Sequence, residues 1–122
     1  MTTTSTRAGS PVIVAVYLVL SLVGLVGTWW FNLSFFLAGG SDYLGGWFAN
    51  AASSSAAVDI LVAGAAACVL IVVEGRRLGF RPVLIGGLVV LSAVIAVAFT
   101  FPLFLALRER ALSAPTVPGG GR

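Results

Sequence analysis

Residues 59–77 read DILVAGAAACVLIVVEGRR, and this stretch decides how the rest of the chain is interpreted. Only 14 uncharged residues separate Asp59 from Glu74, whereas a bilayer core needs ~20 apolar residues. If the segment spans a membrane, it therefore carries acids in its end turns. Longer uncharged segments lie on both sides, with 34 residues before Asp42 and 26 before Arg108. We therefore predict that residues 59–77 form the central helix of a small integral membrane protein.

The composition supports a membrane protein. Of the 122 residues, 59% are hydrophobic and 9% are charged, against about 25% charged residues in soluble domains. The net charge of +3 comes from arginines near the predicted helix ends, which we interpret as topology signals that contact the lipid bilayer rather than nucleic acid. Because the chain has no histidine and one cysteine, Cys68 in an apolar run, we expect no metal site and no cofactor.

The apolar segments predict an all-α membrane protein with three transmembrane helices and a short interfacial helix between the first and second. The expected spans cover residues 11–37, 54–78 and 82–107. They form one domain over residues 11–112. Residues 1–10 and 113–122 are rich in small and polar residues and are expected to be a disordered and a flexible tail.

The connections carry recognisable signals. Between the first two spans, four residues recur at a spacing that would lay them along the membrane surface on a short helix: Tyr43, Leu44, Trp47 and Phe48. One of the serines at 53–55 is expected to cap the second span. Pro102 has no N–H to donate, so we expect it to kink the third span near its far end.

Two faces of small residues predict close helix packing. In the first span Ser21, Gly24 and Thr28 recur at three and four residues and form one thin face. In the second span a further small face joins two acids on one side of the helix: Asp59, Ala63, Ala66, Ala67, Leu70 and Glu74. Because an acid that faces lipid is costly, we expect this second face to point inward against neighbouring helices.

Charge predicts an orientation for a multi-pass protein of the cell membrane. The short connection before Pro82 holds three arginines, whereas residues 39–55 hold none. The positive-inside rule then places the amino terminus in the cytoplasm and the carboxyl terminus outside. With three spans, Asp59 and Arg108 would lie on the same side and could pair. Glu74 would lie near Arg76 or Arg77 on the other side, with Tyr17 at a similar depth.

Four short stretches resemble a known group: Phe48-Ala49-Asn50, Asp59, Glu74-Gly-Arg-Arg, and Pro102-Leu-Phe-Leu-Ala-Leu-Arg-Glu-Arg110. Through them, residues 12–112 are similar to short bacterial membrane proteins known only as a domain of unknown function. The resemblance implies a three-helix protein of the bacterial inner membrane and brings no activity with it. The polar residues singled out as structural or functional candidates are Tyr17, Asn50, Asp59, Glu74, Arg76, Arg77, Pro102, Arg108 and Glu109.

Three functions fit the sequence. The first is a small non-enzymatic interaction or accessory subunit that binds a membrane protein partner or a second copy of itself, because slim helices favour helix partners. The alternative is an oligomeric transporter for ions or small molecules, because acids inside a membrane often mark a transport path. A weaker alternative is an intramembrane lipid-modifying enzyme that uses Asp59 and Glu109 as acid and base. No residue is predicted to be catalytic.

Overall fold

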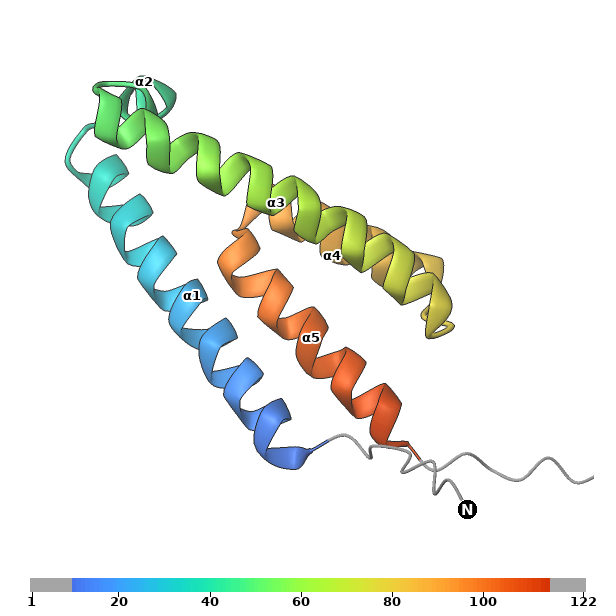
Figure 1. Ribbon diagram of the computed structural model, residues 1–122. Helices are drawn as coiled ribbons and strands as arrows, with labels where there is room; N and C mark the ends of the chain where they lie inside the picture. The colour runs from blue at the N-terminus through green and yellow to red at the C-terminus, as the bar shows by residue number, and fades with distance from the viewer. Residues whose placement is uncertain (1–9, 115–122) are drawn as a thin grey trace, which may run out of the picture.

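A computed structural model describes residues 10–114 of the chain. Over these residues the chain forms five helices: α1 (Pro11–Leu37), α2 (Tyr43–Trp47), α3 (Ala51–Arg77), α4 (Pro82–Val94) and α5 (Val97–Ser113) (Figure 1). The predicted all-α fold class is confirmed. Residues 1–9 and 115–122, which hold most of the two predicted tails, lie outside the described residues.

Two helices, α1 and α3, are candidates for membrane spans. Each is 27 residues long, or about 40 Å at 1.5 Å per residue. Both are long and apolar enough to cross a membrane, judged by length and composition alone. Little of either helix is buried against the rest of the chain, so most of their apolar side chains face outward.

The predicted third span is wrong as a single helix. α4 ends at Val94, the backbone is extended at Ala96, and α5 begins at Val97. Buried Ser92 and Thr100 hydrogen-bond to each other across the break, and the hydroxyl that accepts in this pair donates to the carbonyl four residues before it, Leu88 for Ser92 or Ala96 for Thr100. No proline or glycine marks the break in the sequence. The polar groups that stabilise it become partners only once the chain has turned.

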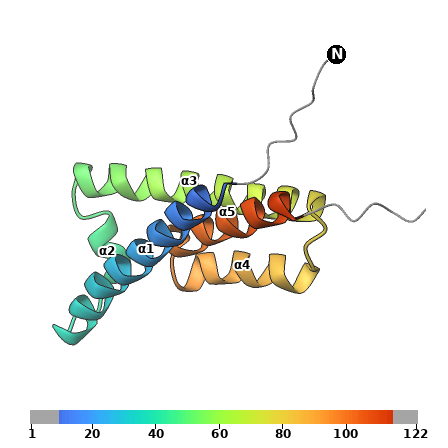
Figure 2. The ribbon, with the colours of Figure 1, turned by 90° about the horizontal axis from the view of Figure 1, so that it is seen from below.

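The break reverses the direction of the chain. α4 runs back alongside α3, and α5 then runs in the same direction as α3, so the three helices lie side by side (Figure 2). The two ends of the described chain consequently meet, because the backbone N–H of Ser10 donates to Glu109 Oε1 at 3.2 Å. The predicted orientation, with the amino terminus in the cytoplasm and the carboxyl terminus outside, requires the two ends to lie apart and does not fit this contact.

Local signals explain where the helices begin and end. Pro11 and Pro82 occupy first-turn positions, where a missing N–H costs nothing. Gly79 ends the α3 region at φ 74°, a conformation that glycine adopts readily. Asn50 caps α3: its side chain accepts from Ser53 N at 2.9 Å, and Ser53 Oγ accepts from Asn50 N. The cap was predicted among the serines, so α3 starts three residues earlier than expected.

The packed core lies at one end of the molecule, which we call the closed end (residues 71–91 and 100–110). Four side chains from α3, α4 and α5 form it: Ile71, Ile85, Leu88 and Phe104. Phe80 stands edge-on to Phe104 with ring centroids 6.1 Å apart. Gly75 leaves room for Ile85, so α3 and α4 approach closely there. At the closed end, the large apolar side chains are therefore buried by other helices of the same chain.

α1 is attached mainly through α5, at a contact that the sequence partly predicts. Pro102 has no N–H for the carbonyl of Ala98, four residues earlier. Gly24 of α1 lies against that carbonyl so closely that an added Cβ would overlap it. Beside it, Ser21 Oγ donates to the Phe99 carbonyl at 2.8 Å. The packing role predicted for Ser21 and Gly24 is confirmed.

Candidate functional site

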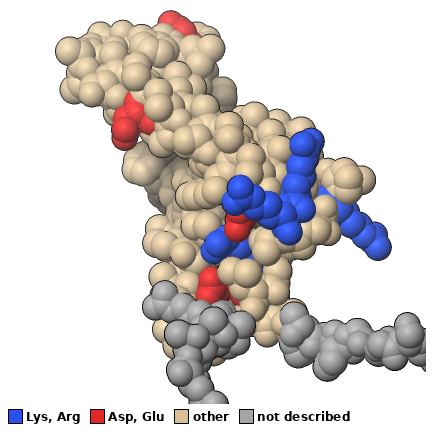
Figure 3. All heavy atoms as spheres, turned by 45° about the vertical axis from the view of Figure 1, so that its right-hand side comes forward, with Lys and Arg blue, Asp and Glu red and all other residues tan. Residues whose placement is uncertain are grey.

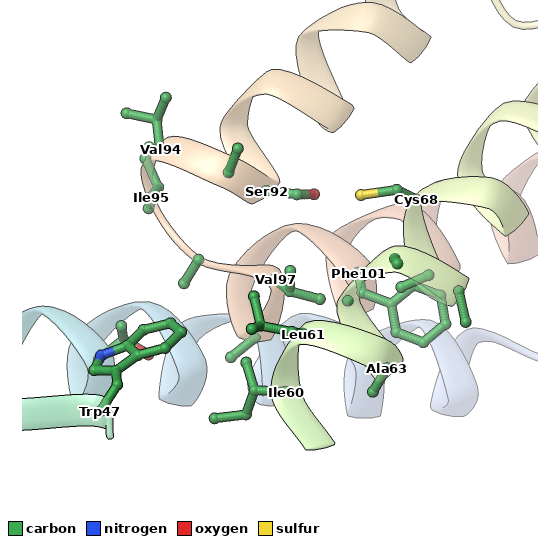
Figure 4. A pocket seen from close by; sticks show the side chains of 18 of the residues that line it. Trp47, Ile60, Leu61, Ala63, Cys68, Ser92, Val94, Ile95, Val97 and Phe101 are labelled. Atoms are coloured by element: carbon green, nitrogen blue, oxygen red, sulfur yellow. The ribbon is translucent and has the colours of Figure 1, made fainter. Parts of the chain in front are cut away.

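A groove of about 1100 Å³ opens at the other end of the molecule, which we call the open end (residues 25–70 and 92–99), and the groove extends to Phe101 at the border of the closed end. Here α1 and α3 lie apart, with α2 between them (Figure 2). The break between α4 and α5 closes the far side of the groove, where Val97 and Phe101 face Leu61 and Ala63 of α3 (Figure 4). The groove is lined mainly by apolar side chains, so it suits an apolar occupant.

One wall of the groove is the small-residue face of α3. Ala63, Ala66 and Leu70 line the groove, and all three are exposed. Asp59 lies on the same side of the helix and is also exposed. The prediction that this face packs inward against the chain's own helices is therefore wrong for Asp59, Ala63, Ala66 and Leu70. It holds for Ala67, which is buried, and for Glu74, which bonds Arg108 of α5.

A different side of α3 makes the contacts with the rest of the chain. Its buried residues are Ala57, Gly64, Ala67, Ile71 and Gly75. At about 100° per residue, Asp59 lies roughly 160° around the helix from Ala57. Both sides of α3 carry small residues, so composition alone could not tell which one would be buried.

Polar and aromatic groups close the groove at its outer edge. The Tyr43 hydroxyl donates to Asn32 Oδ1 at 2.6 Å, which joins α2 to α1. Trp47 lines the groove with its ring centroid 5.9 Å from that of Tyr43. The short helix was predicted from its aromatic spacing and is confirmed. The partner of Tyr43 was missed, because Asn32 in the sequence indicates only a polar residue near the end of a span.

The arginines of the described residues gather at the closed end together with two of the four acids, Glu74 and Glu109 (Figure 3). Glu74 Oε1 accepts from Arg108 Nε at 3.0 Å, and Glu74 Oε2 lies 3.8 Å from Arg77 Nη1. The predicted proximity of Arg77 to Glu74 is confirmed. The predicted pairing of Arg108 with Asp59 is wrong, because α5 runs in the same direction as α3 and carries Arg108 to the end of α3 that holds Glu74.

The same reversal separates the two acids considered for catalysis. Glu109 follows Arg108 and accepts from the backbone of Ser10. Asp59 lies 15 residues before Glu74 on α3, about 22 Å away along the helix axis. The prediction that Asp59 and Glu109 lie on the same side of the protein is therefore wrong. The two carboxyl groups are too far apart to act as acid and base on one substrate.

The remaining candidates have structural places or remain predictions. Asn50 caps α3, and Pro102 lies inside α5, where it frees a carbonyl that faces α1. Tyr17 is half-buried in α1, and Arg76 is exposed near the end of α3. Among residues 10–114, no group of three or more potential metal ligands comes together. The described residues thus form an apolar groove at one end and a cluster of arginines at the other.

A comparison with known protein families identifies the family to which the chain belongs. The family model described as "Protein of unknown function DUF2834" matches residues 16–110. The chain belongs to this family. The family match agrees with the resemblance over residues 12–112 and brings no activity with it. No curated protein and no solved structure matches the chain.

Proposed function

We propose that this DUF2834 protein is a small multi-pass protein of the bacterial inner membrane, in which α1 and α3 cross the bilayer. α4 has 13 residues and covers only about 20 Å, too little for a hydrocarbon core of ~30 Å. We therefore propose that α4 and α5 form a re-entrant hairpin. Non-helical backbone at membrane depth is tolerated where it lies within protein. At this break the N–H groups of Ile95 and Ala96 both donate to the Leu91 carbonyl, and the Ser92 and Thr100 hydroxyls bond each other.

The arginines set the orientation of this arrangement. Five of them lie at the closed end: Arg76, Arg77, Arg81, Arg108 and Arg110. The positive-inside rule places the closed end, and with it both ends of the described chain, in the cytoplasm. Fluorescent-protein fusions at either terminus should then both be fluorescent in bacterial cells. A dark carboxyl-terminal fusion at normal expression would contradict the hairpin.

Within the membrane the protein acts as a non-enzymatic interaction or accessory subunit. The observation that carries this proposal is the exposed small-residue face of α3 with its acid. Ala63 and Ala66 permit close approach of a helix backbone, which is how membrane helices associate. Asp59 has no ion-pair partner among residues 10–114, and an acid facing lipid is costly. The occupant is a transmembrane helix of another protein, with a basic or hydrogen-bond-donating side chain opposite Asp59.

Site-specific photocrosslinking in native membranes tests the subunit role. A photoreactive amino acid at Ala66 should give a discrete adduct with a different membrane protein, and the Asp59→Asn substitution should weaken that adduct. The same amino acid at Val90, an exposed position on α4 outside the groove, is the matched control. Equal adducts at Ala66 and Val90, an adduct only with a second copy of this chain, or no adduct at Ala66 would overturn the accessory role.

Asp59, which forms no ion pair within residues 10–114, also favours a second candidate, a path for ions or small molecules between assembled copies. In that case Asp59→Asn should lower proton or solute flux in proteoliposomes, while Asp42→Asn in the loop before α2 should not. Unchanged flux with Asp59→Asn would remove this acid from a transport role.

A further inference from the structure

A second, smaller groove runs along α4 at the closed end. Its volume is about 550 Å³, and residues of α4 and α5 line it. Most of the side chains that line it are apolar, among them Leu84, Leu91, Leu103 and Leu107. One charged residue, Arg81, stands at its mouth and is exposed. The groove is separate from the one at the open end, and none of its residues takes part in the proposed contact with a partner helix.

The length of the groove matches one leaflet of a bilayer. From Arg81 to Leu91 the helix rises about 15 Å, which is half of a hydrocarbon core of ~30 Å. The guanidinium of Arg81 would lie at the level of the lipid headgroups, where the α3–α4 connection meets water. The apolar part would extend from there to the middle of the membrane. A single acyl chain lying along α4 would match the length of the groove and its apolar lining.

The charge at the mouth favours an anionic headgroup. The closed end carries five arginines against two acids, Glu74 and Glu109, which gives 5 − 2 = +3. Glu74 is already engaged by Arg108 and lies near Arg77, whereas Arg81 pairs with no carboxylate in the described part of the chain. A phosphate beside Arg81 would find a cation without an internal partner, since guanidinium groups bind phosphate through well-directed hydrogen bonds.

Gly87 keeps the middle of the groove open. It lines the groove, and a Cβ built on it would meet no atom within 4 Å. Gly86, the residue before it, also has open space around its Cβ position but does not line the groove. The two glycines therefore allow a matched test, because a Cβ atom meets open space at both positions and only Gly87 lines the groove.

We propose that the Arg81-headed groove between α4 and α5 binds one anionic phospholipid of the cytoplasmic leaflet, with its phosphate at Arg81 and one acyl chain passing over Gly87. This inference rests on the proposed membrane location and orientation and does not depend on the partner helix at the open end. The bound lipid would cover the outer side of a hairpin whose inner side is packed by the chain itself.

Native mass spectrometry of the full chain in detergent tests the site, with phosphatidylglycerol and phosphatidylcholine of the same acyl chains as probes. The wild-type protein should retain phosphatidylglycerol several-fold better than phosphatidylcholine. Arg81→Gln should reduce phosphatidylglycerol binding about fivefold, as expected for one arginine at an anionic surface. Gly87→Leu should reduce the binding of both lipids, and Gly86→Leu should leave both unchanged. Glycerol phosphate in excess should not displace the lipid, because the acyl chain supplies part of the affinity.

Several results would overturn the proposal: equal retention of the two lipids, equal loss with Gly86→Leu and Gly87→Leu, or displacement by glycerol phosphate, which would indicate a simple anion site. Melting temperatures measured without added lipid show whether each variant is folded. If Gly87→Leu does not fold, Gly87→Val with Gly86→Val gives the same comparison. Resistance to carbonate extraction from membranes separates failure of this site from failure of the membrane location.

Discussion

The two ends of the molecule differ in how closely their helices pack against one another. At the closed end, α3, α4 and α5 bury large side chains against one another, and Glu74 bonds Arg108. At the open end, α1 and α3 lie apart around an apolar groove, and Asp59 is exposed. Since the same long helix α3 contributes to both ends, the difference comes from what its neighbours do. The closed end is packed by its own chain, and the open end leaves an apolar groove uncovered.

The largest expected effect comes from removing a core aromatic at the closed end. Phe104 is fully buried, so Phe104→Ala should lower the free energy of unfolding in detergent by about 3 kcal/mol through the cavity it leaves. Phe31, on the outward side of α1, is 74% exposed. Phe31→Ala is the matched control and should change the stability by less than about 0.5 kcal/mol. Comparable losses for the two variants would mean that the two ends do not differ in packing.

The next effect concerns the contact that holds α1 to α5. In Gly24→Ala the added methyl group would overlap the Ala98 carbonyl, so the helices must move apart. We expect a loss of about 1–3 kcal/mol, the usual cost of overpacking, measured by thermal unfolding in detergent. Gly27→Ala, one turn further along with open space around it, should be neutral or slightly stabilising. A neutral Gly24→Ala would show that α1 and α5 are not in close contact.

The smallest effect separates the two acids of α3. The Glu74 side chain is 16% exposed and bonds Arg108. A double-mutant cycle with Glu74→Gln and Arg108→Gln should therefore give a coupling free energy of about 0.5–1 kcal/mol. Asp59→Asn combined with Arg108→Gln should give none. Coupling of Arg108 to Asp59 rather than to Glu74 would contradict the reversed direction of α5.

Much of the local structure could be predicted from the sequence. The helical class, the starts of α1 and α4 at proline and the short aromatic helix follow from residue types and spacing. Ser21 and Gly24 could be identified as a packing face because small residues on one side of an apolar helix let a neighbouring helix approach closely. The site was less predictable. The small side of α3 was recognised, but the side of the helix that would be buried was not.

The buried side of α3 could not be predicted because hydropathy is a property of each residue. The direction in which each helix runs depends instead on contacts between residues far apart in the sequence. The amino acids by themselves determined the helices, their apolar surfaces and the clustering of arginines near helix ends. Only the tertiary structure decided that the chain turns at Ala96, because Ser92 and Thr100 become partners after the turn. That turn brings Arg108 to Glu74, joins the two ends of the described chain and leaves Asp59 exposed at the open end.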